Sequence, residues 1–237
     1  MRYTRQELKQ DKFAETAAGA VHWTVAHRKT IISGVIALAV LVAVGVGIFW
    51  YRDHLQAAAA QKLGDALVTY NAPVQPEAPS QGNQMVSFSS VADRALAARK
   101  QFYGISSDEY GSTRAGQWAH YFAALCEVDL GNYAVAEGQL KDVANSRDAE
   151  VSSLAKLALA SVYRNEKKDS DAVAVYKDLI DHPTLSVPKS TAQLGLADLY
   201  QATQPAEANK LYEQIAKDDA KGPAAQIAAQ HQKAAAQ

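Results

Sequence analysis

Only one cysteine, Cys126, occurs among the 237 residues, so the chain cannot form an internal disulfide and has no cysteine pair at metal-ligand spacing. Glycine and proline are also scarce, with 13 and 7 residues, which excludes collagen-like and Pro/Gly-rich disordered chains. Excess basic charge is absent as well, because 24 Lys and Arg face 25 Asp and Glu and the net charge is −1. Nucleic-acid binding requires clustered basic residues, so we expect no nucleic-acid partner.

Catalytic motifs are missing too. The six histidines are scattered along the chain, with neither an HExxH pair nor a cluster of histidines with carboxylates. The sequence contains no GxGxxG, GxxxxGK or GxSxG motif. His120 lies among aromatic residues of a predicted helix, where a packed or surface histidine is the ordinary interpretation. We therefore predict a protein that is not an enzyme and that holds no cofactor and no metal.

Alanine and one apolar run stand out among the residues that are present. The 46 alanines favour close-packed helices. Ile31 to Trp50 form a run of 20 residues without a charge. A helix of this length spans about 30 Å, the thickness of the hydrocarbon core of a bilayer. Trp50 and Tyr51 fall where an interfacial aromatic belt would lie. We predict a transmembrane helix over residues 31–51 that contacts lipid through residues 31–50.

The charges around this run predict its orientation. Six Lys and Arg lie in residues 1–29, whereas only Arg52 and Lys62 lie in residues 51–79. The positive-inside rule then places the N-terminus in the cytoplasm of a bacterium and the body outside the inner membrane, in the periplasm. A cleaved signal peptide is the alternative, because Ala57–Ala60 offers small-residue cleavage sites. Signal h-regions have only about 7–15 apolar residues, so the longer run favours a retained anchor.

An internal repeat occupies the second half of the chain. Ala124, Ala160 and Ala197 mark equivalent positions 36 and 37 residues apart, and Ala136, Ala172 and Ala208 follow at intervals of 36 and 36. Apolar and aromatic residues recur around these alanines: Leu125, Leu130, Tyr133 and Leu140 in the first segment, Leu159, Tyr163, Tyr176, Leu179 and Pro183 in the second, and Leu196, Tyr200, Tyr212 and Ile215 in the third. This period is that of a pair of helices.

These residues resemble the tetratricopeptide repeat, in which a large and a small residue stand side by side on the first helix and an alanine and an aromatic residue mark the second. The second segment fits best, but Lys167 stands at the turn where glycine is usual. The first segment has Gly131 at that turn and carries Glu127 where an aromatic residue is expected.

In tetratricopeptide domains the first helix of each repeat lines a concave surface that binds proteins. The resemblance therefore implies a protein-binding surface formed by Trp118, Tyr121, Leu125 and Val128 of the first repeat, Leu157, Ser161 and Arg164 of the second, and Leu194, Asp198 and Gln201 of the third. Aromatic anchors at residues 118 and 121 are suited to binding a polypeptide. The alternative is that these aromatic residues are core, covered by a predicted helix over residues 91–105.

The layout of the chain resembles the ancillary subunit family of the bacterial Sec translocon. That family combines a short basic cytoplasmic segment, a single inner-membrane anchor and an exported tetratricopeptide body. The resemblance implies association with Sec translocon components and with periplasmic chaperones or export clients. The competing interpretation is a structural scaffold or adaptor for another cell-envelope machine, in division, secretion or outer-membrane assembly.

We therefore expect an all-α fold, with an N-terminal transmembrane helix followed by a tetratricopeptide-like solenoid of helical hairpins. The expected division of the chain is a basic cytoplasmic segment at 1–30, a signal anchor at 31–51, a linking helix and degenerate first repeat at 52–115 with a loop insertion at 73–90, three repeats at 116–219, and a capping helix and tail at 220–237.

Overall fold

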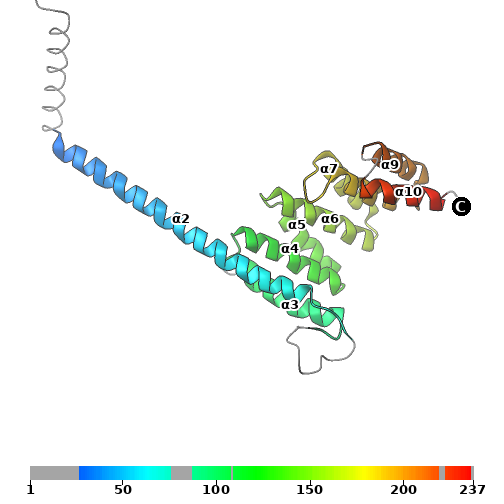
Figure 1. Cartoon of the computed structure of the whole chain (residues 1–237), viewed down its shortest axis with the longest axis horizontal. Coiled ribbons are helices and arrows are strands. Elements are labelled where there is room, and N and C mark those ends of the chain that lie inside the picture. Colours follow the sequence, from blue (N-terminus) through cyan, green and yellow to red (C-terminus); the bar gives the residue numbers. More distant parts are fainter. Residues whose placement is uncertain (1–26, 76–86, 108, 219–221, 236–237) are drawn as a thin grey trace, which may run out of the picture. The chain divides into compact units, whose positions relative to one another are not determined.

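The computed structural model describes residues 27–75, 87–107, 109–218 and 222–235. The fold is all-α, as the sequence predicts, with a long apolar N-terminal helix followed by packed helical hairpins (Figure 1). The chain divides into two units, Met1–His54 and Leu55–Gln237. Most of the basic segment predicted at 1–30 lies outside the described residues.

In the first unit, the described residues form the N-terminal part of helix α2 (Arg28–Tyr70). The large apolar side chains from Ile32 to Tyr51 are each more than half exposed. Such a surface is unfavourable in water and favourable in lipid. Among the described residues, α2 alone is long and apolar enough to cross a membrane, and it allows a single-pass anchor or a signal sequence.

In the second unit, the C-terminal part of α2 is followed by helices that stack in chain order. These are α3 (Val91–Ser107), α4 (Arg114–Asp129), α5 (Tyr133–Ala144), α6 (Ala149–Asn165), α7 (Asp169–Asp181), α8 (Lys189–Tyr200), α9 (Pro205–Asp218) and α10 (Pro223–Ala235). From α3 onward, each helix packs against the next one, and α4 and α8 also contact α6 and α10 respectively (Figure 1). Contacts limited to near neighbours in the chain are typical of a solenoid of helical hairpins.

The alanines that mark the repeat lie where the helices cross. All of them are buried: Ala124, Ala136, Ala160, Ala172, Ala197 and Ala208. Alanine lets two helix backbones approach closely, and large side chains such as Leu140 and Tyr212 fill the space beside the crossings. The predicted solenoid of hairpins is thereby confirmed.

The two ends of the insertion predicted at 73–90 are joined to each other by backbone hydrogen bonds. Val74 and Phe88 form an isolated β-bridge, in which the Gln75 amide donates to the Phe88 carbonyl at 2.8 Å and the Phe88 amide donates to the Pro73 carbonyl at 3.1 Å. The middle of the insertion lies outside the described residues. The bridge holds the end of α2 near the start of α3.

Glu127, which departs from the repeat pattern, is only 3% exposed and is the common hydrogen-bond acceptor of a polar network. Its carboxylate accepts hydrogen bonds from Arg99 Nη1 at 3.2 Å, the Tyr103 hydroxyl at 2.9 Å and Asn132 Nδ2 at 2.7 Å. Burial alone would raise the pKa of Glu127, but the hydrogen bonds from Asn132 and Tyr103 and the charge of Arg99 outweigh it and hold the pKa below its usual value. Because Arg99 and Tyr103 belong to α3, this carboxylate ties α3 to the first repeat.

The turns after α4 and α6 have the same geometry and different residues. Gly131 has a φ of 75° and Lys167 a φ of 59°, both in the left-handed region. At the first turn the Asn132 amide donates to the Glu127 carbonyl, and at the second the Lys168 amide donates to the Tyr163 carbonyl, each at 2.8 Å. These bonds belong to the Schellman motif, which glycine favours.

We expect Lys167→Gly to stabilise the protein by about 0.5–1 kcal/mol, because glycine adopts the left-handed conformation without the steric cost that a side chain pays there. The Lys167 side chain is exposed, so its removal sacrifices little packing. Urea unfolding followed by circular dichroism measures the effect. Gly131→Ala is the matched reverse change and should destabilise the protein by about 1 kcal/mol. A destabilised Lys167→Gly variant would contradict this account of the turn.

Candidate protein-binding surface

The residues predicted to bind proteins lie on α4, α6 and α8, the first helices of the three hairpins, except Gln201, which directly follows α8. Ser161, Arg164 and Gln201 are exposed, while Trp118, Leu125, Val128, Leu157, Leu194 and Asp198 are partly buried and Tyr121 is buried. The structure packs Trp118, Leu125, Val128 and Leu157 against one hydrophobic cluster formed by α4 to α8. Leu194 packs instead against the cluster of α8, α9 and α10. The apolar members thus gather mainly on α4 and α6.

The aromatic residues of α4 divide between the core and the surface. Tyr121 is 9% exposed and belongs to the core cluster that α4 shares with α5 and α6. The ring of Trp118 lies nearly perpendicular to that of Tyr121, at a centroid distance of 6.2 Å, and Trp118 stays partly exposed. Helix α3 contacts this aromatic group through Phe102. The ring of Phe102 stacks on that of Phe122 of α4, with the ring centroids 5.4 Å apart. Trp118 therefore keeps exposed surface with which it can meet a partner.

Farther along α6, three polar residues line a shallow hollow of about 380 Å³: Ser161, Arg164 and Asn165. The Asn165 side-chain amide donates to the Ser161 carbonyl at 3.0 Å, which holds it along the helix. The sequence prediction included Ser161 and Arg164 and missed Asn165. The spacing could have identified Asn165, because residues at i, i+3 and i+4 share one face of a helix.

A comparison with protein families matches a tetratricopeptide repeat-like domain over residues 22–182. The chain belongs to this family. The matched range includes α2 to α7, so α8, α9 and α10 extend the domain beyond it. Comparisons with curated proteins and with solved structures give no match. A tetratricopeptide repeat-like domain is typically non-catalytic and implies protein partners, and the match is not to a catalytic family.

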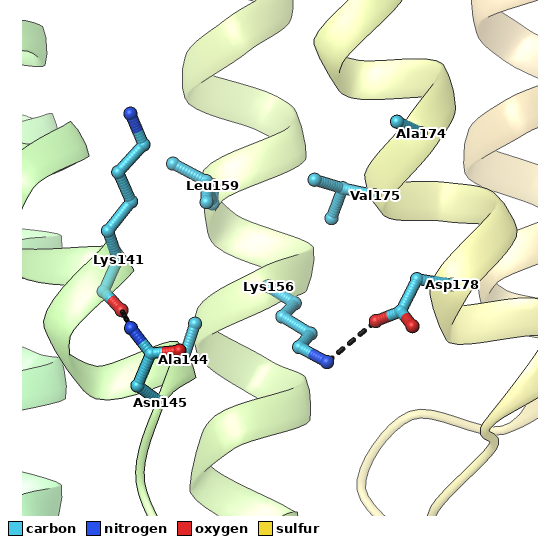
Figure 2. A pocket seen from close by; sticks show the side chains of 8 residues that line it. All are labelled: Lys141, Ala144, Asn145, Lys156, Leu159, Ala174, Val175 and Asp178. Carbon is cyan, nitrogen blue, oxygen red and sulfur yellow. Dashed lines mark hydrogen bonds and ion pairs between the residues drawn. The ribbon is translucent and has the colours of Figure 1, made fainter.

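A second hollow of this tetratricopeptide repeat-like domain, of about 400 Å³, lies between α5, α6 and α7 (Figure 2). Its lining consists of Lys141, Ala144, Asn145, Lys156, Leu159, Ala174, Val175 and Asp178. Figure 2 shows Lys156 directed at Asp178, and the Nζ–Oδ2 distance is 2.6 Å. Lys141 pairs with Glu137 at 2.5 Å. Because both lysines already have carboxylate partners, this hollow offers little unpaired charge to a ligand.

In the tetratricopeptide repeat-like domain, burial affects both the single thiol, Cys126, and the histidine His120. Cys126 is fully buried, and burial is the main reason that its pKa rises to about 12, which keeps the thiol protonated and unreactive. His120 is half-buried, and burial lowers its pKa, so the ring is neutral at pH 7. Within the described part of the chain, no group of three or more His, Cys, Asp or Glu side chains could hold a metal ion.

Proposed function

We propose that the protein is a membrane-tethered, non-enzymatic interaction module that binds polypeptides during export, in association with the Sec translocon and periplasmic chaperones. The observation that carries the proposal is the partly exposed apolar stripe on α4 and α6, with Trp118, Leu125 and Leu157, in a tetratricopeptide repeat-like domain that follows a helix able to span a membrane. A tether of this kind confines the domain to the membrane surface, where exported chains emerge.

The stripe has the composition of a binding site for apolar segments. Aromatic and aliphatic side chains that are partly exposed and held by a packed core commonly dominate binding energy at protein interfaces. Trp118, Leu125 and Leu157 meet this description, because each packs against the α4–α8 cluster while keeping part of its surface accessible. Unfolded export clients expose apolar segments of this kind before they fold.

The proposed topology has the N-terminus in the cytoplasm, a retained anchor over residues 31–51 and the helical domain in the periplasm. It is supported by the excess of Lys and Arg before the apolar run and by the exposed apolar surface of α2. The proposed division of the remainder is a linking region at 52–115, three repeats at 116–219 and a capping segment at 220–237.

Photo-crosslinking in living cells tests both the partners and the topology. A photoreactive aromatic residue at Trp118 should trap translocon components, periplasmic chaperones or export clients. The same residue at Lys177, which is exposed on α7, is the matched control and should not trap them.

Three outcomes would contradict the proposal. Trapping of cytoplasmic proteins would overturn the topology. Trapping of components of a division, secretion or outer-membrane assembly machine, with no export component, would favour a scaffold instead. Equal trapping from both positions would show that the stripe is not the binding site.

A further inference from the structure

We propose that Ser161, Arg164 and Asn165 form a subsite for an acidic side chain of the bound polypeptide. The polypeptide would place an aspartate or glutamate carboxylate against the Arg164 guanidinium and apolar side chains beside it, over Leu157 and Leu125. This inference rests on the proposed function, because it specifies which segments the proposed binding surface prefers.

The hollow formed by Ser161, Arg164 and Asn165 lies next to the apolar stripe along α6. Leu157 precedes Ser161 by one helical turn, and the Ser161 hydroxyl donates to the Leu157 carbonyl at 3.4 Å. Arg164 and Asn165 follow on the same face and are both exposed. A segment lying across α6 therefore meets an apolar residue and a guanidinium about one to two turns apart.

Arg164 and Lys167, at the end of α6, are exposed and form no ion pair within the described part of the chain, unlike several other cations of this region. Arg99, Arg114 and Lys156 form ion pairs with Glu127, Asp148 and Asp178. No described residue provides such a partner for Arg164. Guanidinium groups bind carboxylates through two parallel hydrogen bonds, which makes a free arginine in a polar hollow well suited to a carboxylate.

One acidic residue of α4 and one of α8 already have partners. Asp129 of α4 lies 4.0 Å from Arg94, and Asp198 of α8 accepts a hydrogen bond from the Tyr212 hydroxyl at 3.0 Å. Neither needs a cation from the ligand, and both would repel a second acidic side chain placed on α4 or α8.

This subsite suits an internal side chain rather than the carboxylate at a chain end. The predicted binding residues of α4 and α8 include neither lysine nor arginine, so Arg164 is the one cation among them. A single guanidinium can hold one acidic side chain of a segment that lies across α6.

Selection from a random library of twelve-residue peptides, displayed with both ends joined to carrier sequence, tests the inference on the full chain in detergent. Selected peptides should be enriched in apolar residues and in one Asp or Glu. The Arg164→Glu chain should still select apolar peptides without the acidic residue. A peptide selected by the unsubstituted chain should bind the Arg164→Glu chain about fivefold or more weakly, which corresponds to about 1 kcal/mol. The matched control Arg147→Glu, in the exposed loop before α6, should change binding by less than about twofold.

The outcomes separate this inference from the proposed function. Apolar peptides selected without acidic enrichment, or with an enrichment that Arg164→Glu leaves intact, would overturn the subsite and leave the binding surface standing. An acid preference seen only in a second library with free C-termini would assign the hollow to a terminal carboxylate and overturn the inference. If no peptide is enriched by either library, both the subsite and the proposed function fail.

Discussion

Replacing Glu127 by alanine is expected to destabilise the helical domain by about 3–5 kcal/mol, the usual cost of breaking a buried charged pair. The substitution leaves Arg99, Tyr103 and Asn132 without their common acceptor and opens a space between α3 and α4. Urea unfolding of the full chain in detergent, followed by circular dichroism, measures the change. Glu213→Ala, at an exposed position of α9, is the control and should stay within about 0.5 kcal/mol of the unsubstituted chain.

The contribution of Glu127 should also depend on pH. Its pKa is held below the usual value in the folded protein, so the carboxylate stabilises the fold fully at pH values above the unfolded pKa. This stabilisation is lost as the pH falls through the folded pKa. The stability difference between the unsubstituted chain and Glu127→Gln should therefore be largest at neutral pH and shrink under acid conditions. A difference that is independent of pH would show that packing, and not charge, accounts for the role of Glu127.

Tyr176→Ala is expected to destabilise the domain by about 3–5 kcal/mol, as truncations of buried aromatic residues do. Tyr176 is 2% exposed and lies on α7 within the cluster shared by α4 to α8. A Cβ atom added to Gly195 of α8 would lie 2.4 Å from Cε1 of its ring. The ring therefore occupies the space that a side chain at residue 195 would need, and its loss leaves a cavity between two successive repeats.

A double-mutant cycle tests this packing directly. Gly195→Ala alone should cost about 1–3 kcal/mol, because the buried Tyr176 ring has little room to move. In the Tyr176→Ala background the same change should cost much less, since the new methyl group enters the cavity. Gly138→Ala on α5 is the control, because an added Cβ there meets nothing within 4 Å, and it should stabilise the helix by about 0.5–1 kcal/mol. Additive effects of Gly195→Ala and Tyr176→Ala would contradict the proposed contact.

Sequence reasoning predicted the fold class because the decisive signals are local or periodic. The uncharged run from Ile31 to Trp50 is long enough for a bilayer whatever it packs against. The repeat alanines recur every 36 or 37 residues, and such a period reports helix pairs directly. The ten-residue binding prediction followed from the resemblance to tetratricopeptide domains and stays a prediction, and helix positions alone could not distinguish which of these residues are buried.

Tertiary structure decided the features that depend on partners distant in the chain. In the sequence, Glu127 is only a departure from a pattern, whereas in the structure it binds Arg99, which lies 28 residues earlier. The placement of Tyr121 in the core and of Phe122 against α3 depends on how three helices meet, which helical periodicity alone leaves open. The same holds for the unpaired guanidinium of Arg164. Whether two charged groups form an ion pair depends on the distance between them. That distance is set only when the helices have packed.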